Sequence, residues 1–158
     1  MHRILATLAV VGVLLFSAGA ACADFDDGVA AYHSGDYEKA FREFLPLAQQ
    51  GNTDAQNNLG AMYDGGMGVL ENDAEAVKWY RKAAEQGHAN AQTSLGIMYV
   101  LGIGVSKDYV KALMWFSLAK AEGHEGAAKS LDLVKEQMNT DQISEAQKLA
   151  AEMLEKHN

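Results

Sequence analysis

The chain contains one motif with the spacing of a catalytic nucleophile, Ser117-Leu118-Ala119-Lys120. Ser-x-x-Lys carries the nucleophile in penicillin-recognising enzymes, which also use Ser-Asp-Asn and Lys-Thr-Gly segments. Neither tripeptide occurs in this sequence. Ser117 also falls inside a helical apolar pattern, where Arg81 stands 36 residues earlier. We therefore interpret the motif as a coincidence of helix composition and predict no catalytic residue.

Histidines are the next candidates for chemistry. His33 stands alone before a short loop, whereas His88 and His124 each follow a glycine that ends a helical pattern. The sequence has no His-Glu-x-x-His motif and only 1 cysteine, so no group of residues has the spacing of a metal site. The pattern favours turn roles for His88 and His124, and it predicts no metal and no cofactor.

These two histidines belong to a repeat that organises the chain. Residues 55–88 recur 36 positions later as residues 91–124. Within each copy, apolar residues at spacings of three and four predict two amphipathic helices joined by a glycine-rich loop. Self-similarity at this period is typical of a solenoid. We assign structural roles to the recurring residues Leu59, Gly60, Tyr63, Gly68, Trp79, Ala83, Leu95, Gly96, Tyr99, Gly104, Trp115 and Ala119.

The shared pattern is Ala-x-x-x-Leu-Gly-x-x-Tyr, then Gly-x-Gly-Val, then Ala-x-x-Trp-Tyr/Phe-x-x-Ala-x-x-x-Gly, in residues 55–87 and 91–123. It resembles the Sel1-like repeat, a relative of the tetratricopeptide repeat. The resemblance implies an all-α fold, a right-handed superhelix of antiparallel helix pairs, and a role in binding other proteins. Some cysteine-rich Sel1-like relatives have been called β-lactamases or penicillin binders, so a hydrolase or penicillin-binding activity is the alternative function. With 1 cysteine, this chain departs from those relatives.

Two of the recurring glycines lie inside helical patterns. Glycine in a helix costs about 1 kcal/mol relative to alanine, so Gly60 and Gly96 need a compensating contact. We predict that the missing side chain lets a neighbouring helix approach closely, under the bulk of Trp79 or Trp115. The tryptophans occupy apolar helix positions, which favours core packing over an aromatic ligand pocket.

The first residues of the chain have the composition of a secretory signal peptide, with a basic start, an apolar run over residues 4–16 and small residues up to Ala23. This run is shorter than the roughly 20 residues that span a bilayer. We expect cleavage after Ala23 and a periplasmic or secreted protein without a membrane span. Lipidation at Cys22 is the alternative, although Gly19 stands where such sites usually have leucine.

The charge balance restricts the class of partner. The chain has 13 Lys and Arg against 21 Asp and Glu, a net charge of −8. Cleavage after residue 23 would remove one basic and no acidic residue, so the mature chain would have a net charge of −9. Nucleic acid and anionic lipid surfaces repel a protein of that charge. The expected partner is another protein or a peptide segment, with basic groups as the electrostatic match.

The remaining segments complete the array. We divide the chain into a signal peptide (1–23), an N-terminal tetratricopeptide-like helix pair (24–51), two Sel1-like repeats (52–88 and 89–124) and a C-terminal part with a partial repeat helix and a last helix (125–158). The last helix carries an apolar stripe of Ile143, Ala146, Ala150, Met153 and Leu154. We predict that this stripe caps the solenoid, since exposed apolar ends need covering. Docking on a partner or on a second copy is the alternative.

Binding is predicted where the two repeats differ. The resemblance implies that the first helix of each pair lines the concave surface, and several unlike positions share one face of that helix. Small and amide-bearing side chains there leave room for an extended segment or a helix of another protein. A face that is only solvated is the alternative. The hypothetical protein-binding residues are Asn57, Asn58, Ala61, Asp64, Thr93, Ser94, Ile97 and Val100.

Overall fold

A computed structural model describes residues 23–156, and within this range it contains eight α-helices and no strand. The predicted signal peptide and Cys22 lie outside the described residues, apart from Ala23. The helices are α1 (Phe25–Ser34), α2 (Tyr37–Gln49), α3 (Thr53–Gly65), α4 (Asp73–Ala84), α5 (Ala89–Leu101), α6 (Tyr109–Ala121), α7 (Glu125–Lys135) and α8 (Thr140–Glu155).

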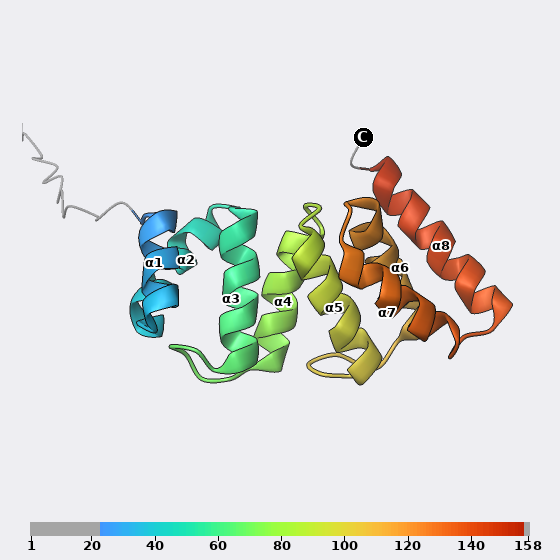
Figure 1. The fold of residues 1–158 in the computed structure, drawn as a ribbon, viewed down its shortest axis with the longest axis horizontal. Coiled ribbons are helices and arrows are strands. Elements are labelled where there is room, and N and C mark those ends of the chain that lie inside the picture. Colours follow the sequence, from blue (N-terminus) through green and yellow to red (C-terminus); the bar gives the residue numbers. More distant parts are fainter. Residues whose placement is uncertain (1–22, 157–158) are drawn as a thin grey trace, which may run out of the picture.

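Consecutive helices pack against each other along the whole row from α1 to α7, so the helix pairs stack one after another into an elongated array (Figure 1). The predicted all-α solenoid is confirmed. Helices α3 and α5 are the first helices of the two repeats, and α4 and α6 are the second. Asn72 and Asp108 cap the second helices, because their side chains accept hydrogen bonds of 3.0 Å from the amides of Glu75 and Lys111.

The two recurring histidines cap the first helices of the following units. His88 and His124 have extended backbone conformations at the N-caps of α5 and α7. Their Nδ1 atoms accept hydrogen bonds from the amides of Ala91 (3.2 Å) and Ala127 (3.1 Å). At these N-caps an unprotonated ring nitrogen accepts the hydrogen bond that a serine or aspartate side-chain oxygen accepts at most N-caps. The turn role predicted for both residues is confirmed.

The helices of a pair meet at a glycine, but the partner is not the tryptophan that we predicted. A Cβ atom added at Gly60 would lie 2.6 Å from the ring of Tyr80, and one added at Gly96 would lie 2.6 Å from the ring of Phe116. Tyr80 and Phe116 follow the tryptophans by one residue, a rotation of about 100° around the helix. That rotation aims the aromatic residue rather than the tryptophan at the glycine.

The same contact occurs in the first pair of helices, where the sequence of the first helix does not match the register of the repeats. A Cβ atom at Gly28 of α1 would lie 2.6 Å from the ring of Phe44 of α2. Both residues are buried. The first pair therefore closes by the same glycine–aromatic contact as the two repeats.

A second glycine contact joins each repeat to the unit before it. Gly68 and Gly104 have φ angles of +69° and +66°, in the left-handed region that favours glycine. A Cβ atom at Gly68 would meet the backbone of Tyr37, and one at Gly104 would meet the backbone of Asp73. Tyr37 and Asp73 are the first residues of α2 and α4. The loop of each repeat thus rests on the start of the preceding second helix.

The tryptophans are buried elsewhere in the core. Trp79 is 8% exposed and belongs to a core cluster with residues of α1, α2 and α3. Trp115 is 3% exposed and belongs to a core cluster with residues of α4 to α8. Tyr63 is half-buried and contacts both groups of core residues. The burial agrees with core packing for the tryptophans.

Helix α8 covers the end of the array by packing on α6 (Figure 1). From the apolar stripe predicted in this helix, Ala146 and Ala150 are buried, and Ile143 and Met153 pack against the core while half-buried. These four residues thus lie where α8 meets the rest of the array, and the capping role stays a prediction. Leu154 differs, since it is 38% exposed and lines a cavity at the end of the helix.

The glycine–aromatic contact predicts how substitutions at Gly96 change stability. Gly96→Ala should lower the free energy of unfolding by about 1–3 kcal/mol through overpacking against Phe116, although alanine is the better helix former. Gly96→Val should cost more. Urea unfolding followed by circular dichroism measures both. The matched control adds Phe116→Leu to the Gly96→Ala variant. The smaller side chain should recover part of the free energy of unfolding that Gly96→Ala loses. An alanine variant as stable as the parent protein would contradict the contact.

Candidate protein-interaction groove

Three pockets lie in a series along the first helices α1, α3, α5 and α7. We name them the N-terminal, central and C-terminal pockets, with volumes of about 140, 200 and 150 Å³. The N-terminal pocket is lined by Val29, Tyr32, His33, Phe44 and Asn58. The central pocket is lined by Asp64, Tyr80, Ser94, Ile97, Met98, Leu101 and Ile103. The C-terminal pocket is lined by Ile97, Val100, Leu101, Phe116, Ser130, Leu133 and Val134.

The three pockets share the period of the sequence. Each contains an aromatic residue of a second helix, and Phe44, Tyr80 and Phe116 follow one another at intervals of 36 residues. Each also contains a small polar residue of a first helix, and Asn58, Ser94 and Ser130 have the same interval. The pockets are therefore equivalent sites in successive units, and each contains the aromatic ring that packs against the glycine.

The central and C-terminal pockets form a continuous apolar surface. Ile97 and Leu101 line both pockets, and they are 44% and 59% exposed. Ile103 at one side is 36% exposed, and Leu133 at the other is 64% exposed. Single exposed apolar residues are common on protein surfaces, but a contiguous apolar patch with polar neighbours marks an interaction site. We call the three pockets together the groove.

The electrostatics of the central pocket are set by two acidic groups. Burial, together with the nearby Asp64 carboxylate, raises the pKa of the Tyr80 hydroxyl to about 12. Partial burial raises the pKa of the Asp64 carboxyl above its ordinary value, and the Asp73 carboxylate adds to this shift. At neutral pH, Tyr80 remains an uncharged hydrogen-bonding group while Asp64 gives this part of the groove a negative charge.

The structure brings five of the eight predicted binding residues into the groove. Asn58 lines the N-terminal pocket, and Asp64 and Ser94 line the central one. Ile97 is shared between the central and C-terminal pockets, and Val100 lines the C-terminal one.

The other three predicted residues line none of the three pockets of the groove. Ala61 packs against the core. The hydroxyl of Thr93 donates a 2.9 Å hydrogen bond to the carbonyl of Ala89 in its own helix. Asn57 is half-buried in α3. The binding role of all eight residues stays a prediction.

Sequence reasoning missed the contribution of α7. Ser130 and Leu133 lie 36 residues after Ser94 and Ile97, and both line the C-terminal pocket. The predicted residues came from differences between the two complete repeats, and α7 belongs to neither. Extending the same period into the partial third helix would have identified both residues.

The serine of the Ser-x-x-Lys segment is hydrogen-bonded within its own helix. The hydroxyl of Ser117 donates a 2.7 Å hydrogen bond to the carbonyl of Leu113 in α6. Lys120 is exposed on the last turn of that helix. Within residues 23–156, no three His, Cys, Asp or Glu side chains come together in a way that could hold a metal ion.

Comparison with known proteins agrees with this architecture. The Sel1 repeat family matches residues 53–88 and 89–124, which are α3 with α4 and α5 with α6. The chain is a Sel1-like repeat protein. Members of this repeat class generally act in protein–protein interaction and are typically scaffolds without catalysis.

Two solved structures extend the likeness beyond the two matched repeats. A protective antigen present in uropathogenic Escherichia coli strains, which displays an SLR fold, is 32% identical with a TM-score of 0.78. A Sel1 repeat protein from Oxalobacter formigenes is 34% identical with a TM-score of 0.69. Each match covers 82% of this Sel1-like chain, which spans only 29% of the first protein and 56% of the second. No curated protein matches the chain.

The longest helix in the described part of this Sel1-like protein is α8, with 16 residues. No helix within residues 23–156 is both long and apolar enough to cross a membrane.

The raised pKa of Asp64 predicts a pH-dependent effect of its removal. Because the folded state disfavours the charged carboxylate, ionised Asp64 lowers stability above its folded pKa. Asp64→Asn should therefore raise the urea midpoint at pH 7, and the difference should vanish near about pH 3, where the carboxyl is protonated in both states. Glu145→Gln, an exposed position in α8, controls for the loss of one negative charge. An equal rise at both pH values would contradict this origin.

Proposed function

We propose that this Sel1-like repeat protein is an exported adaptor that binds a segment of another protein in its groove. The observation that carries the proposal is the recurrence of a pocket lined by an aromatic residue in three successive units. Exposed Ile97 and Leu101 line both the central and the C-terminal pocket, and exposed Leu133 lines the C-terminal one. An extended or helical segment with apolar side chains at suitable intervals would place them in adjacent pockets.

Polar groups along the groove supply the specificity that apolar contacts lack. Asn58, Ser94 and Ser130 stand once in each pocket and offer a carboxamide or hydroxyl beside the apolar floor. Such groups fix the register of a bound backbone through hydrogen bonds. The negative charge of Asp64 and of the whole chain favours a partner with basic residues, chiefly by accelerating association at low salt.

A double substitution in the groove tests this function. Asn58→Arg with Ser94→Arg would fill two pockets with long charged side chains while leaving the buried core unchanged, because both residues are only half-buried. A protein captured from the cell envelope by the parent chain, once purified, should bind the double variant at least roughly tenfold more weakly. Rising salt should also weaken binding to the parent protein.

The matched control carries the same charge change at another surface. Ser144→Arg with Gln147→Arg alters two exposed positions of α8 and should bind the partner like the parent protein. Circular dichroism establishes that both double variants fold. Full affinity in the folded groove variant would place the interaction elsewhere, and deletion of residues 140–158 would then test α8.

Export is the second part of the proposal and depends on the sequence of residues 1–23. Expression of the full chain with fractionation of the cells should place the mature protein outside the cytoplasm. Mass spectrometry should give an N-terminus at Asp24. A mature protein that begins with an acylated Cys22 would replace cleavage after Ala23 by lipidation, and an unprocessed chain in the cytoplasm would refute export.

A further inference from the structure

One buried glutamine joins each repeat to the preceding helix. Gln56 donates a 3.0 Å hydrogen bond through Nε2 to the carbonyl of Ala48 at the end of α2. Gln92, 36 residues later, donates a 3.1 Å bond to the carbonyl of Ala84 at the end of α4. Both side chains are buried, with exposed fractions of 4% and 3%. Each fixes its carboxamide oxygen in a definite direction, because the nitrogen is held by the helix end.

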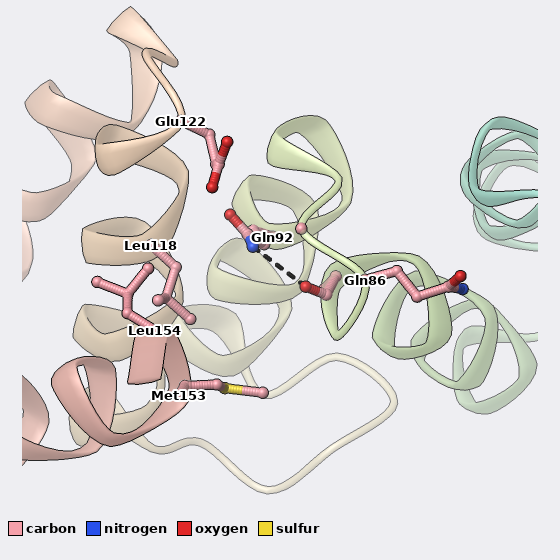
Figure 2. A pocket seen from close by; sticks show the side chains of 8 residues that line it. Gln86, Gln92, Leu118, Glu122, Met153 and Leu154 are labelled. Carbon is pink, nitrogen blue, oxygen red and sulfur yellow. Dashed lines mark hydrogen bonds between the residues drawn. The ribbon is translucent and has the colours of Figure 1, made fainter. Parts of the chain in front are cut away.

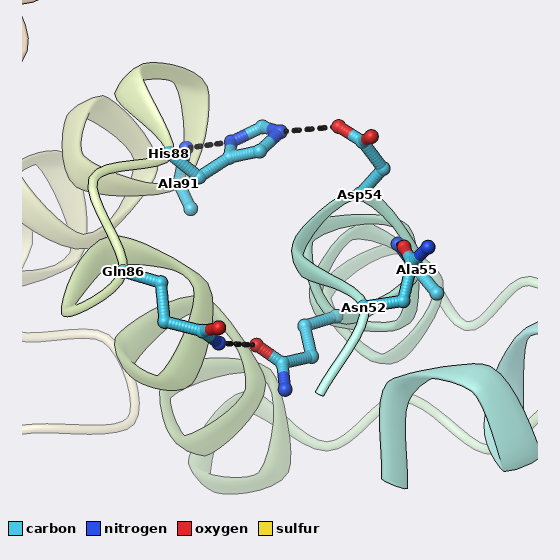
Figure 3. A network of polar contacts seen from close by, with 7 residues as sticks. Asn52, Asp54, Ala55, Gln86, His88 and Ala91 are labelled. Carbon is cyan, nitrogen blue, oxygen red and sulfur yellow. Dashed lines mark hydrogen bonds and ion pairs between the residues drawn. The ribbon is translucent and has the colours of Figure 1, made fainter. Parts of the chain in front are cut away.

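The two carboxamide oxygens differ in their partners. In the first repeat, Gln86 donates a 2.8 Å hydrogen bond from Nε2 to Oε1 of Gln56 (Figure 3). The position of Gln86 is taken by Glu122 in the second repeat, 36 residues later. A carboxylate cannot donate a hydrogen bond. Among the described residues, Oε1 of Gln92 is accordingly buried and has no hydrogen-bond partner.

Gln92 lines a cavity of about 260 Å³ between the α4–α5 turn, the end of α6 and the end of α8. Figure 2 shows the Glu122 carboxylate directed toward the Gln92 carboxamide, so that two acceptors face each other. Leu118, Met153 and Leu154 line the apolar side of the cavity. The cavity is much larger than one water molecule, whose share of liquid volume is about 30 Å³.

We propose that this cavity binds a guanidinium group carried on an alkyl chain. Guanidinium has five N–H donors in a planar fork, so it can pair with both oxygens of the Glu122 carboxylate and still donate toward Oε1 of Gln92. Supplying that donor relieves the cost of a buried acceptor without a partner. The alkyl chain would pack along Leu118, Met153 and Leu154.

The acidic surroundings match a cation. Met153 also lines a neighbouring cavity with Glu85, Glu152 and Lys156, and the whole chain has a net charge of −8. The site is separate from the groove, because no residue lines both. Ser94, the groove residue nearest to Gln92 in α5, is two positions further along and therefore projects from the helix about 200° away from Gln92. The proposal therefore does not depend on the function of the groove.

The test uses butylguanidinium as the probe and the purified protein labelled with ¹⁵N. Addition of the probe should shift the side-chain amide signals of Gln92 in a saturable manner. Uncharged 1-butanol should leave those signals unchanged at the same concentrations. Calcium chloride is titrated in parallel, because an inorganic cation would also be attracted to the Glu122 carboxylate.

Two substitutions at Glu122 separate binding from stability. Glu122→Gln places in the second repeat the residue that Gln86 is in the first, so its amide should donate a hydrogen bond to Oε1 of Gln92. This variant should have a higher urea midpoint, and the probe should no longer shift the Gln92 signals. Glu122→Ala removes the carboxylate without supplying a donor, so it should weaken probe binding at least roughly tenfold without raising the midpoint. Circular dichroism checks that both variants fold.

Three results would each overturn the guanidinium site. They are equal probe affinity in the parent protein and Glu122→Ala, no saturable shift of the Gln92 signals, and a stronger response to calcium than to butylguanidinium. A blocked peptide with a central arginine distinguishes two sources of the group. Tighter binding of the peptide than of butylguanidinium identifies an arginine of a polypeptide, whereas weaker binding identifies a small guanidine compound.

Discussion

The close approach of a helical glycine to an aromatic ring is the contact on which the structure depends. Gly28, Gly60 and Gly96 each lie where a Cβ atom would be 2.6 Å from the ring of the partner helix. No larger residue fits at these positions without moving the ring, so the distance between the two helices of a pair is set by the glycine. A ring held in this way packs beneath the first helix and also lines the pocket beside it. Core packing and the shape of the groove therefore have one cause.

The repeat in the sequence was sufficient to predict the fold. Two copies at a period of 36 residues, with helical spacing and caps at Asn72 and Asp108, specify helix pairs that must bury their apolar faces against each other. The aromatic partner of the glycine was predicted wrongly, since Trp79 and Tyr80 are adjacent and both apolar. Periodicity alone does not distinguish neighbouring positions when both are buried. Only the crossing of the two helices decides which ring meets Gly60.

The candidate site was predictable in part. Differences between the two complete repeats led to Asn58, Ser94 and Ile97, which line the pockets. The exposed apolar side chains of Leu101 and Leu133 were not predicted, because apolar residues in an amphipathic repeat are usually assigned to the core. The exchange of Gln86 for Glu122 is visible in the sequence, but its meaning depends on the burial of the Gln92 oxygen near Glu122.

The contacts of Gly68 with the backbone of Tyr37 and of Gly104 with that of Asp73 make the junctions between units interchangeable. Each junction uses the same positions of the 36-residue period, so a tandem duplication of one period would join at both ends through contacts already present. Every such insertion would lengthen the array by one helix pair and one pocket. The length of the array is thus set in whole steps of one 36-residue period, and relatives with more copies would be longer by whole helix pairs.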